Sequence, residues 1–165
     1  MDAKTVYFSD RFFSTGFTDI VNENNDKLGE LNLQSMFTAG IHVLDERGDV
    51  SYSGKFRFFS NAWLVFDRYG EEIGVLKAKM SLFSKRYWYE GSQGELEIES
   101  PAFSREYTVS TMGGETVAEF KRTDGFFGAG AFALSNHSKI PMEELILVVM
   151  GVHAIQKRHN NAAST

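Results

Sequence analysis

The sequence predicts a mainly β protein: a closed antiparallel β-barrel of about 12 strands that encloses a C-terminal hydrophobic α-helix. Two observations carry this prediction. As far as residue 136, short runs of alternating apolar and polar residues are separated by polar turn clusters. Beyond residue 140 the pattern changes. From Leu145 to Ile155 only Gly151 and His153 interrupt an apolar run, so a helix there has no polar face.

The predicted strands lie between clusters rich in Asn, Asp, Glu and Gly, which favour tight hairpin turns. The clusters are NENNDK (22–27), DERGD (45–49), DRYGEE (67–72), EGSQGE (90–95), MGGET (112–116) and RTDG (122–125). The strands are predicted at residues 7–14, 17–22, 27–34, 37–45, 50–59, 61–67, 72–80, 81–90, 94–100, 104–110, 116–122 and 130–136. Segments 19–31 and 63–76 resemble each other, either as a repeated unit or because hairpins with tight turns look alike.

The helix is predicted over about residues 141–158, in a single domain of residues 1–159 that is followed by a short polar tail at 160–165. Pro141 suits a first helical turn, because its missing N–H would have no partner there. Carboxylates favour the N-terminal end of the helix dipole and cations the C-terminal end. The sequence has this arrangement, with Glu143 and Glu144 at the start and Lys157 and Arg158 at the end.

The apolar helix decides the architecture. A helix that is apolar all round must be buried all round. A closed sheet wrapped around the helix buries it and also removes exposed strand edges. A barrel of a dozen strands is wider than side chains alone can fill, and the helix occupies the extra space.

Composition excludes several classes of protein. The 165 residues suit one domain. The net charge of -5 argues against a general nucleic-acid binder, although it is compatible with a local basic patch. The sequence has no Cys, which excludes disulfides, thiolate zinc sites and a cysteine nucleophile and fits a reducing compartment. No signal peptide is visible, and the apolar run is shorter than the roughly 20 residues that span a bilayer.

Motifs of catalysis and metal binding are absent from the sequence. It contains no G-x-S-x-G elbow, H-E-x-x-H pair or P-loop. Segment 22–33 superficially resembles a calcium loop, but Lys27 stands where Gly is needed and Leu33 where Glu is needed. The four His have no metal-ligand spacing, and His153 is interpreted as a core histidine with a hydrogen-bond partner. We therefore expect no catalytic residue, metal or cofactor.

Two basic pairs are candidate phosphate ligands. Lys55 and Arg57 are two residues apart in one predicted strand, as are Lys77 and Lys79 in another, so each pair points to one face. A phosphate site needs several donors that converge, and Arg adds bidentate geometry. The alternative is that these are solvated outward positions of a barrel.

Aromatic residues are candidates for a membrane interface. Trp88 follows the basic residues 85–86 in SKRYWYE, and Trp and Tyr anchor at the level of lipid headgroups. The alternative places Trp88 inside the barrel, with its neighbours outward. Phe126 and Phe127 in the Gly-rich segment 125–132 are predicted to form an exposed tip, or else the glycines let the chain bend.

The order of these features resembles the tubby C-terminal-like superfamily, most of all its LURP-one-related proteins and their bacterial YxjI-like relatives. The residues that carry the resemblance are VFDRYGEEIGVLKAKMSLFSKRYWYE (65–90) and IPMEELILVVMGVHAI (140–155). Tubby-type domains bind phosphoinositide headgroups through basic residues on the barrel, and the spacing of Lys55 and Arg57 is similar to their basic pair. Phospholipid scramblases of the same superfamily are linked to membranes and calcium, but no residues here support a calcium role.

The resemblance implies a non-enzymatic module that binds phospholipid or phosphoinositide, or tethers to a membrane surface. The expected partner is an anionic phospholipid headgroup, and the expected location is cytoplasmic, with peripheral association at the membrane. The alternative is a protein-interaction scaffold or a dimerising protein, without lipid binding; exposed apolar residues should then cluster in one patch. An enzyme or a ligand carrier would need a cleft with convergent titratable groups or an empty lumen, and the helix argues against the lumen.

Overall fold

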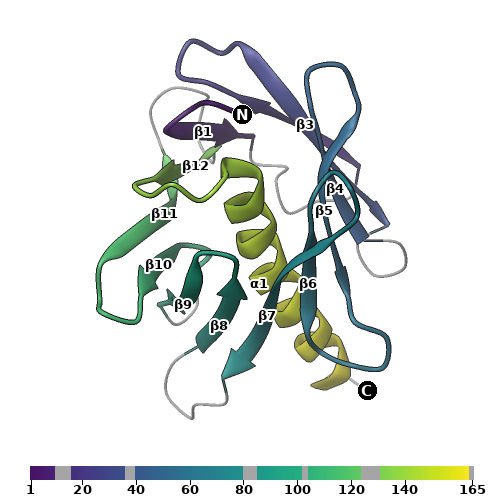
Figure 1. Cartoon of the computed structure of the whole chain (residues 1–165), viewed down its shortest axis with the longest axis vertical. Coiled ribbons are helices and arrows are strands. Elements are labelled where there is room, and N and C mark those ends of the chain that lie inside the picture. Colours follow the sequence, from purple (N-terminus) through teal and green to yellow (C-terminus); the bar gives the residue numbers. More distant parts are fainter. Residues whose placement is uncertain (10–15, 36–39, 80–84, 102–103, 124–130, 164–165) are drawn as a thin grey trace.

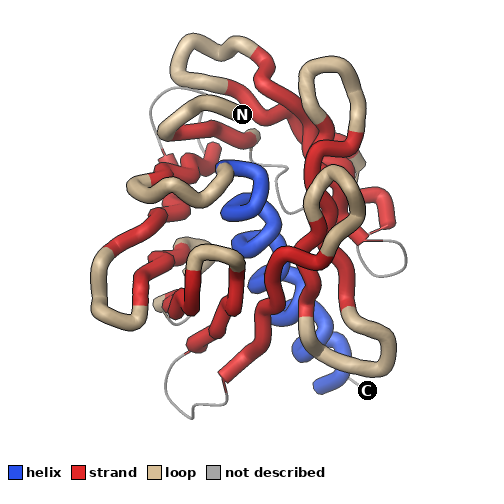
Figure 2. Tube along the Cα trace, in the orientation of Figure 1, coloured by secondary structure: helices blue, strands red, loops and turns tan. Residues whose placement is uncertain are grey.

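The computed structural model describes residues 1–9, 16–35, 40–79, 85–101, 104–123 and 131–163 (Figures 1 and 2). Within these ranges the protein is a closed barrel of 12 antiparallel strands with a single helix at the C-terminal side of the sequence. Each strand pairs with the next one along the chain, and the first pairs with the last to close the barrel. The predicted fold class is confirmed.

Among the described residues, β5, β6 and β10 are shorter than predicted, whereas the predicted strand ends at 10–14, 37–39, 80–84 and 130 lie outside the described residues. Their bounds are β1 Thr5–Phe8, β2 Phe17–Val21, β3 Lys27–Ser35, β4 Gly40–Leu44, β5 Val50–Phe56, β6 Trp63–Phe66, β7 Glu72–Lys79, β8 Lys85–Gly91, β9 Gly94–Ser100, β10 Tyr107–Thr111, β11 Thr116–Thr123 and β12 Ala131–Asn136. The helix, α1, covers Met142–Ala163.

Short polar side chains fix the hairpin turns. Asn22 Oδ1, Asp45 Oδ1 and Asp67 Oδ1 each accept hydrogen bonds from the backbone N–H groups two and four residues later, at 2.9 to 3.0 Å. This bonding holds the backbone in a turn without help from the barrel. Segments 19–31 and 63–76 share this turn.

Helix α1 runs through the barrel (Figure 1). Every side chain from Leu145 to Met150 is fully buried. Trp63 on β6 holds the helix in place, because its indole N–H donates to the Leu147 carbonyl at 3.1 Å. Gly151 makes this approach possible, since a Cβ at this position would overlap the Trp63 ring.

The helix continues beyond its predicted end. It reaches Ala163, so Lys157 and Arg158 lie before the last turn, which contains no basic residue. Arg158 instead makes tertiary contacts: Nη1 donates to the Ser60 carbonyl at 2.9 Å, and the guanidinium lies 4.3 Å from the Phe56 ring centroid. The end of the helix is thereby attached to the loop between β5 and β6.

In β8, the side chain of Trp88 faces outward and not into the barrel. Tyr87 and Tyr89 are buried in the core, whereas Trp88 is half-buried on the outer face. The Tyr89 ring fits because it lies against Gly74 and Gly91, where any Cβ would overlap it. The interior placement of Trp88 is therefore wrong.

Candidate functional site

The outer surface of β5, β6 and β7 carries the predicted phosphate ligands. Lys55, Arg57, Lys77 and Lys79 are all exposed. Lys55 lies opposite Leu64 in the β5–β6 register, and Leu64 faces outward between the two basic strands. We call this surface, defined by these four cations, the basic face. The structure thus places the four predicted residues on one outer surface: Lys55 is level with Val75, and Lys79 lies four residues further along β7.

Arg57 and Lys77 lie on either side of Ala62. The Arg57 backbone N–H donates to the Ala62 carbonyl at 2.9 Å. Trp63 pairs with Leu76, so Lys77, the next residue of β7, lies beside Ala62. The two basic residues are therefore two inter-strand spacings apart, about 10 Å. Since both side chains are long and Ala62 is small, the cationic groups can converge on one phosphate.

Weak local contacts hold these cations on the surface. Arg57 Nη2 lies 3.5 Å from Glu72 Oε1, and the two side chains are 48% and 43% exposed. An ion pair this exposed contributes about 1 kcal/mol at most and is easily exchanged for a phosphate. Lys55 Nζ lies 4.9 Å from the Phe66 ring centroid, and Lys79 Nζ lies 4.4 Å from that of Trp88. These rings hold the ammonium groups without neutralising them.

Carboxylates bound the basic face on the side of β9. Arg86 on β8 donates to Glu97 at 3.3 Å and lies 2.8 Å from Glu99. This cation is therefore already compensated, and the carboxylates beyond it repel an anion. The favourable region for a phosphate lies over β5 to β7.

The predicted interface residues have different outcomes. Trp88 stands on the outer face beside the basic face, as a membrane-interface residue requires. Phe126 and Phe127 lie outside the described residues. Sequence reasoning missed Phe58 and Phe59, which are 83% and 93% exposed, because it assigned them to the end of a strand at residues 50–59.

The end of the barrel at which α1 begins holds two buried carboxylates, both in the first turn of the helix. The Tyr89 hydroxyl donates to Glu144 Oε1 at 2.7 Å, and burial raises the pKa of Glu144. Burial also raises the pKa of the Tyr89 hydroxyl, with the nearby Glu144 carboxylate as the second cause. Glu143 is paired with the Met1 amine. Because both carboxylates have partners within the fold, we assign them the role of fixing the helix start.

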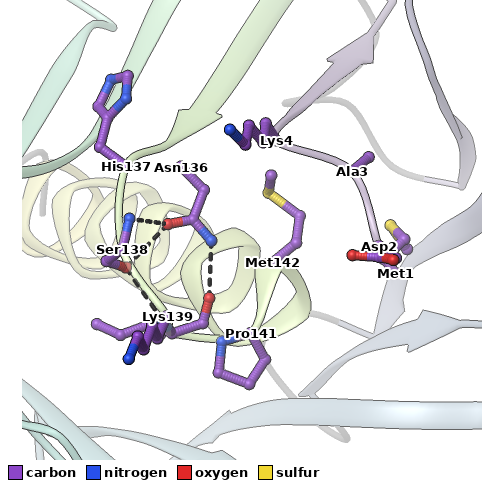
Figure 3. Close-up of a pocket in the computed structure, with 11 residues that line it drawn as sticks. Met1, Asp2, Ala3, Lys4, Asn136, His137, Ser138, Lys139, Pro141 and Met142 are labelled. Atoms are coloured by element: carbon purple, nitrogen blue, oxygen red, sulfur yellow. Dashed lines mark hydrogen bonds between the residues drawn. The ribbon is translucent and has the colours of Figure 1, made fainter.

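A surface depression of about 860 Å³ lies next to this helix start (Figure 3). Asn136 forms its wall: the side-chain amide donates to the Ile140 carbonyl at 2.7 Å, and Oδ1 accepts from Ser138. Ser138 Oγ in turn accepts from the Ile140 N–H at 3.1 Å. These groups bond to one another across the connection from β12 to α1, so they shape the connection and do not point donors at a ligand.

The described residues contain no cluster of three or more His, Asp or Glu that could hold a metal ion. Over the same residues, no helix combines the length and apolar character needed to cross a membrane. His153 lies in α1 near the end that carries Arg158, and burial lowers its pKa to about 4, with Lys157 and Arg105 as further causes.

Comparison with known proteins supports the fold. No protein-family model matches this sequence, and no curated protein matches it. An X-ray structure of a protein from Arabidopsis thaliana is similar over 96% of this chain and 93% of that chain, with a TM-score of 0.57 and 13% sequence identity. At this identity the likeness concerns the fold alone, and it shows that the arrangement is a known one.

Proposed function

We propose that this protein is a non-enzymatic module that binds an anionic phospholipid headgroup through the basic face. The observation that carries the proposal is the placement of Arg57 and Lys77 on either side of Ala62. Lys55 and Lys79 lie two residues from this row, in opposite directions along the strands. Guanidinium and ammonium groups arranged in this way suit a phosphate with more than one charged oxygen. Trp88 at the edge of the face supplies a ring that favours the headgroup region.

The proposal includes membership of the tubby C-terminal-like superfamily, in its LURP-one-related branch. Support comes from the shared order of the elements: consecutive antiparallel hairpins closed into a barrel, then an apolar helix inside it. We further propose a cytoplasmic protein that associates peripherally with the membrane. The phosphate could belong to phosphatidylserine or to a phosphoinositide, and the same cations suit both.

The test is co-sedimentation with liposomes. Wild-type protein is mixed with phosphatidylcholine vesicles, with vesicles that also contain phosphatidylserine, and with vesicles that contain a phosphoinositide, at low and near-physiological salt. We expect binding only to anionic vesicles, weaker at higher salt. Lys55→Glu/Arg57→Glu should weaken binding by at least about tenfold, because each cation near an anionic surface contributes about 1 kcal/mol.

A matched control is available at the other end of the barrel. Arg47→Glu/Arg68→Glu makes the same change in net charge at exposed turn residues outside the basic face. Equal losses for both double variants would mean that net charge, and not the basic face, decides binding. No binding to any vesicle would refute the lipid proposal and favour the protein-interaction scaffold.

A further inference from the structure

The loop between β5 and β6 presents two neighbouring phenylalanines to solvent. Phe58 and Phe59 are 83% and 93% exposed, and their ring centroids are 4.1 Å apart. Phe59 has a φ of 54°, in the left-handed region that bulky residues rarely adopt. Exposing two large apolar side chains in this way stabilises nothing inside the fold, so the arrangement suggests a contact with something outside it.

The hydrogen bonds made by Ser60 in this loop have a counterpart at Ser104. In the first, the Ser60 N–H donates to the Arg57 carbonyl, and Ser60 Oγ accepts from the Ala62 N–H at 3.0 Å. In the second, the Ser104 N–H donates to the Pro101 carbonyl, and Ser104 Oγ accepts from the Glu106 N–H at 2.9 Å. A Phe precedes the Ser in both sequences.

The barrel topology places these turns at one end. All neighbouring strands are antiparallel, so every connection from an odd-numbered strand to the next strand starts at the same end of the barrel. The proposal below uses only the described residues of this end.

Cations gather at the same end. The strand ends and the helix there carry the following basic residues: Arg57, Lys79, Lys85, Arg105, Arg122, Lys157 and Arg158. In Figure 1 the β5–β6 loop lies beside the C-terminal end of α1, and Arg158 joins the two through the Ser60 carbonyl. We call this the basic end.

The other end of the barrel is acidic. Its hairpin turns carry the following carboxylates: Glu23, Asp26, Asp45, Glu46, Asp49, Asp67, Glu71 and Glu115. Arg47 and Arg68 are the cations of the same turns. A strand such as β8, with seven residues, is about 23 Å long, more than two Debye lengths at physiological salt. The basic end can therefore meet an anionic surface although the net charge of the chain is -5.

We propose that the protein docks end-on to an anionic membrane, with the basic end toward the lipid and Phe58 and Phe59 inserted among the headgroups. The inference rests on the proposed function and adds an orientation and an anchor to it. A protruding pair of rings suits a soft lipid surface, whereas a protein partner would need a pocket of matching shape. A second copy of the chain is a poor occupant, because two copies meeting by this end would oppose the same cations.

The absence of Cys from the sequence allows single-site labelling. Asn61→Cys places a fluorophore sensitive to polarity next to the two rings and leaves both in place. Tyr69→Cys is the control, because Tyr69 is 83% exposed in the β6–β7 turn at the acidic end. With vesicles of phosphatidylcholine and phosphatidylserine, we expect the label at residue 61 to shift to the blue and to be quenched by nitroxide lipids. The label at residue 69 should do neither.

Removing the rings tests their contribution. Phe58→Ser and Phe59→Ser, each made in the Asn61→Cys protein, should each weaken vesicle binding by about tenfold, since burial of a Phe contributes at least about 1.5 kcal/mol. The serine variants should unfold at the same denaturant concentration as the parent, because the rings are exposed. If vesicles bind but the label at 61 stays aqueous and the serine variants bind normally, the insertion is refuted and the headgroup site stands.

A tethered experiment separates the two proposals. A C-terminal histidine tag on vesicles with nickel-chelating lipid brings the basic end to the bilayer without any headgroup site. Insertion of the label at residue 61 under these conditions supports the anchor even if free protein fails to bind vesicles. An aqueous label on tethered protein refutes it. If sedimentation equilibrium instead shows a dimer that Phe58→Ser/Phe59→Ser converts to monomer, the rings form a self-interface and the membrane inference is wrong.

Discussion

Gly151 allows a sharp test of how the helix sits in the barrel. In an ordinary helix, Gly→Ala stabilises by about 1 kcal/mol. Here the added Cβ would overlap the Trp63 ring and come within 2.8 Å of a methyl group of Leu76. The ring cannot retreat, because its N–H is bonded to the Leu147 carbonyl and its far edge lies against Gly54.

The expected result is that Gly151→Ala destabilises the protein. Overpacking of a rigid core costs about 1 to 3 kcal/mol, and the constrained ring favours the upper figure. After the helix gain is subtracted, the free energy of unfolding should fall by about 2 kcal/mol. For a chain of this size the melting temperature should fall by about 4 to 8 °C. Urea unfolding followed by circular dichroism measures the free energy of unfolding, and thermal unfolding followed in the same way measures the melting temperature.

Two controls make the test specific. Gly113→Ala adds a Cβ that meets nothing closer than Thr111 Oγ1 at 3.6 Å, so stability should hardly change. In a Trp63→Leu background the ring is gone and the Leu76 methyl group can move into the space that it leaves, so Gly151→Ala should then be neutral or stabilising. A Gly151→Ala protein that is at least as stable as wild type would refute the close contact between helix and indole.

Four further predictions concern the core and the helix ends. Val148→Asp should abolish folding, because Val148 is fully buried and an unpaired charge there has no compensation; a soluble protein with a cooperative melt would contradict this. The pKa of Glu144 is raised by burial, so the folded state keeps the Glu144 proton to higher pH than the unfolded state does. The stability that this proton contributes is lost as pH rises above about 4.5. Urea titrations at several pH values should show that Glu144→Gln removes this loss. His153, with its pKa lowered to about 4, should reduce stability as pH falls from about 6.5 toward 4, because the unfolded chain takes up the proton first; an unchanged pH profile in His153→Asn would refute this. Arg158→Met should cost about 1 kcal/mol of stability yet clearly increase amide hydrogen exchange at Ala62, whose N–H bonds to Ser60; equal exchange would show that the helix does not hold the loop.

The barrel and its helix could be predicted because their signals are local. Asn22, Asp45 and Asp67 form turns with their own neighbours, so their positions in the sequence divide it into hairpins. The apolar run from Leu145 to Met150 has no polar side to expose, so burial on all sides follows from the sequence alone. A sheet closed around the helix is then the arrangement that covers the helix on every side.

Other features depend on partners that are distant in the sequence. Residues 87–89 are all aromatic, so the alternation of the strand did not show which of them face the core. Tyr89 faces inward because Gly74 and Gly91 leave space for its ring. The strand at 50–59 was predicted too long because Phe is typical of strands. Strand β5 stops at Phe56, and the two phenylalanines after it are exposed instead.

The same residues connect the core to the surface that we propose to be functional. Trp63 begins β6 and bonds to the middle of α1, while Arg158 near the end of α1 bonds to Ser60 in the loop before β6. The loop is therefore fixed on both sides by the buried helix, and Phe56, packed edge-on against Trp63 at 5.2 Å, also lies beneath the Arg158 guanidinium. A rigid support reduces the entropy that exposed side chains lose on binding. By fixing the loop, the apolar helix inside the barrel therefore preorganises the exposed rings of Phe58 and Phe59 for the contact that we propose.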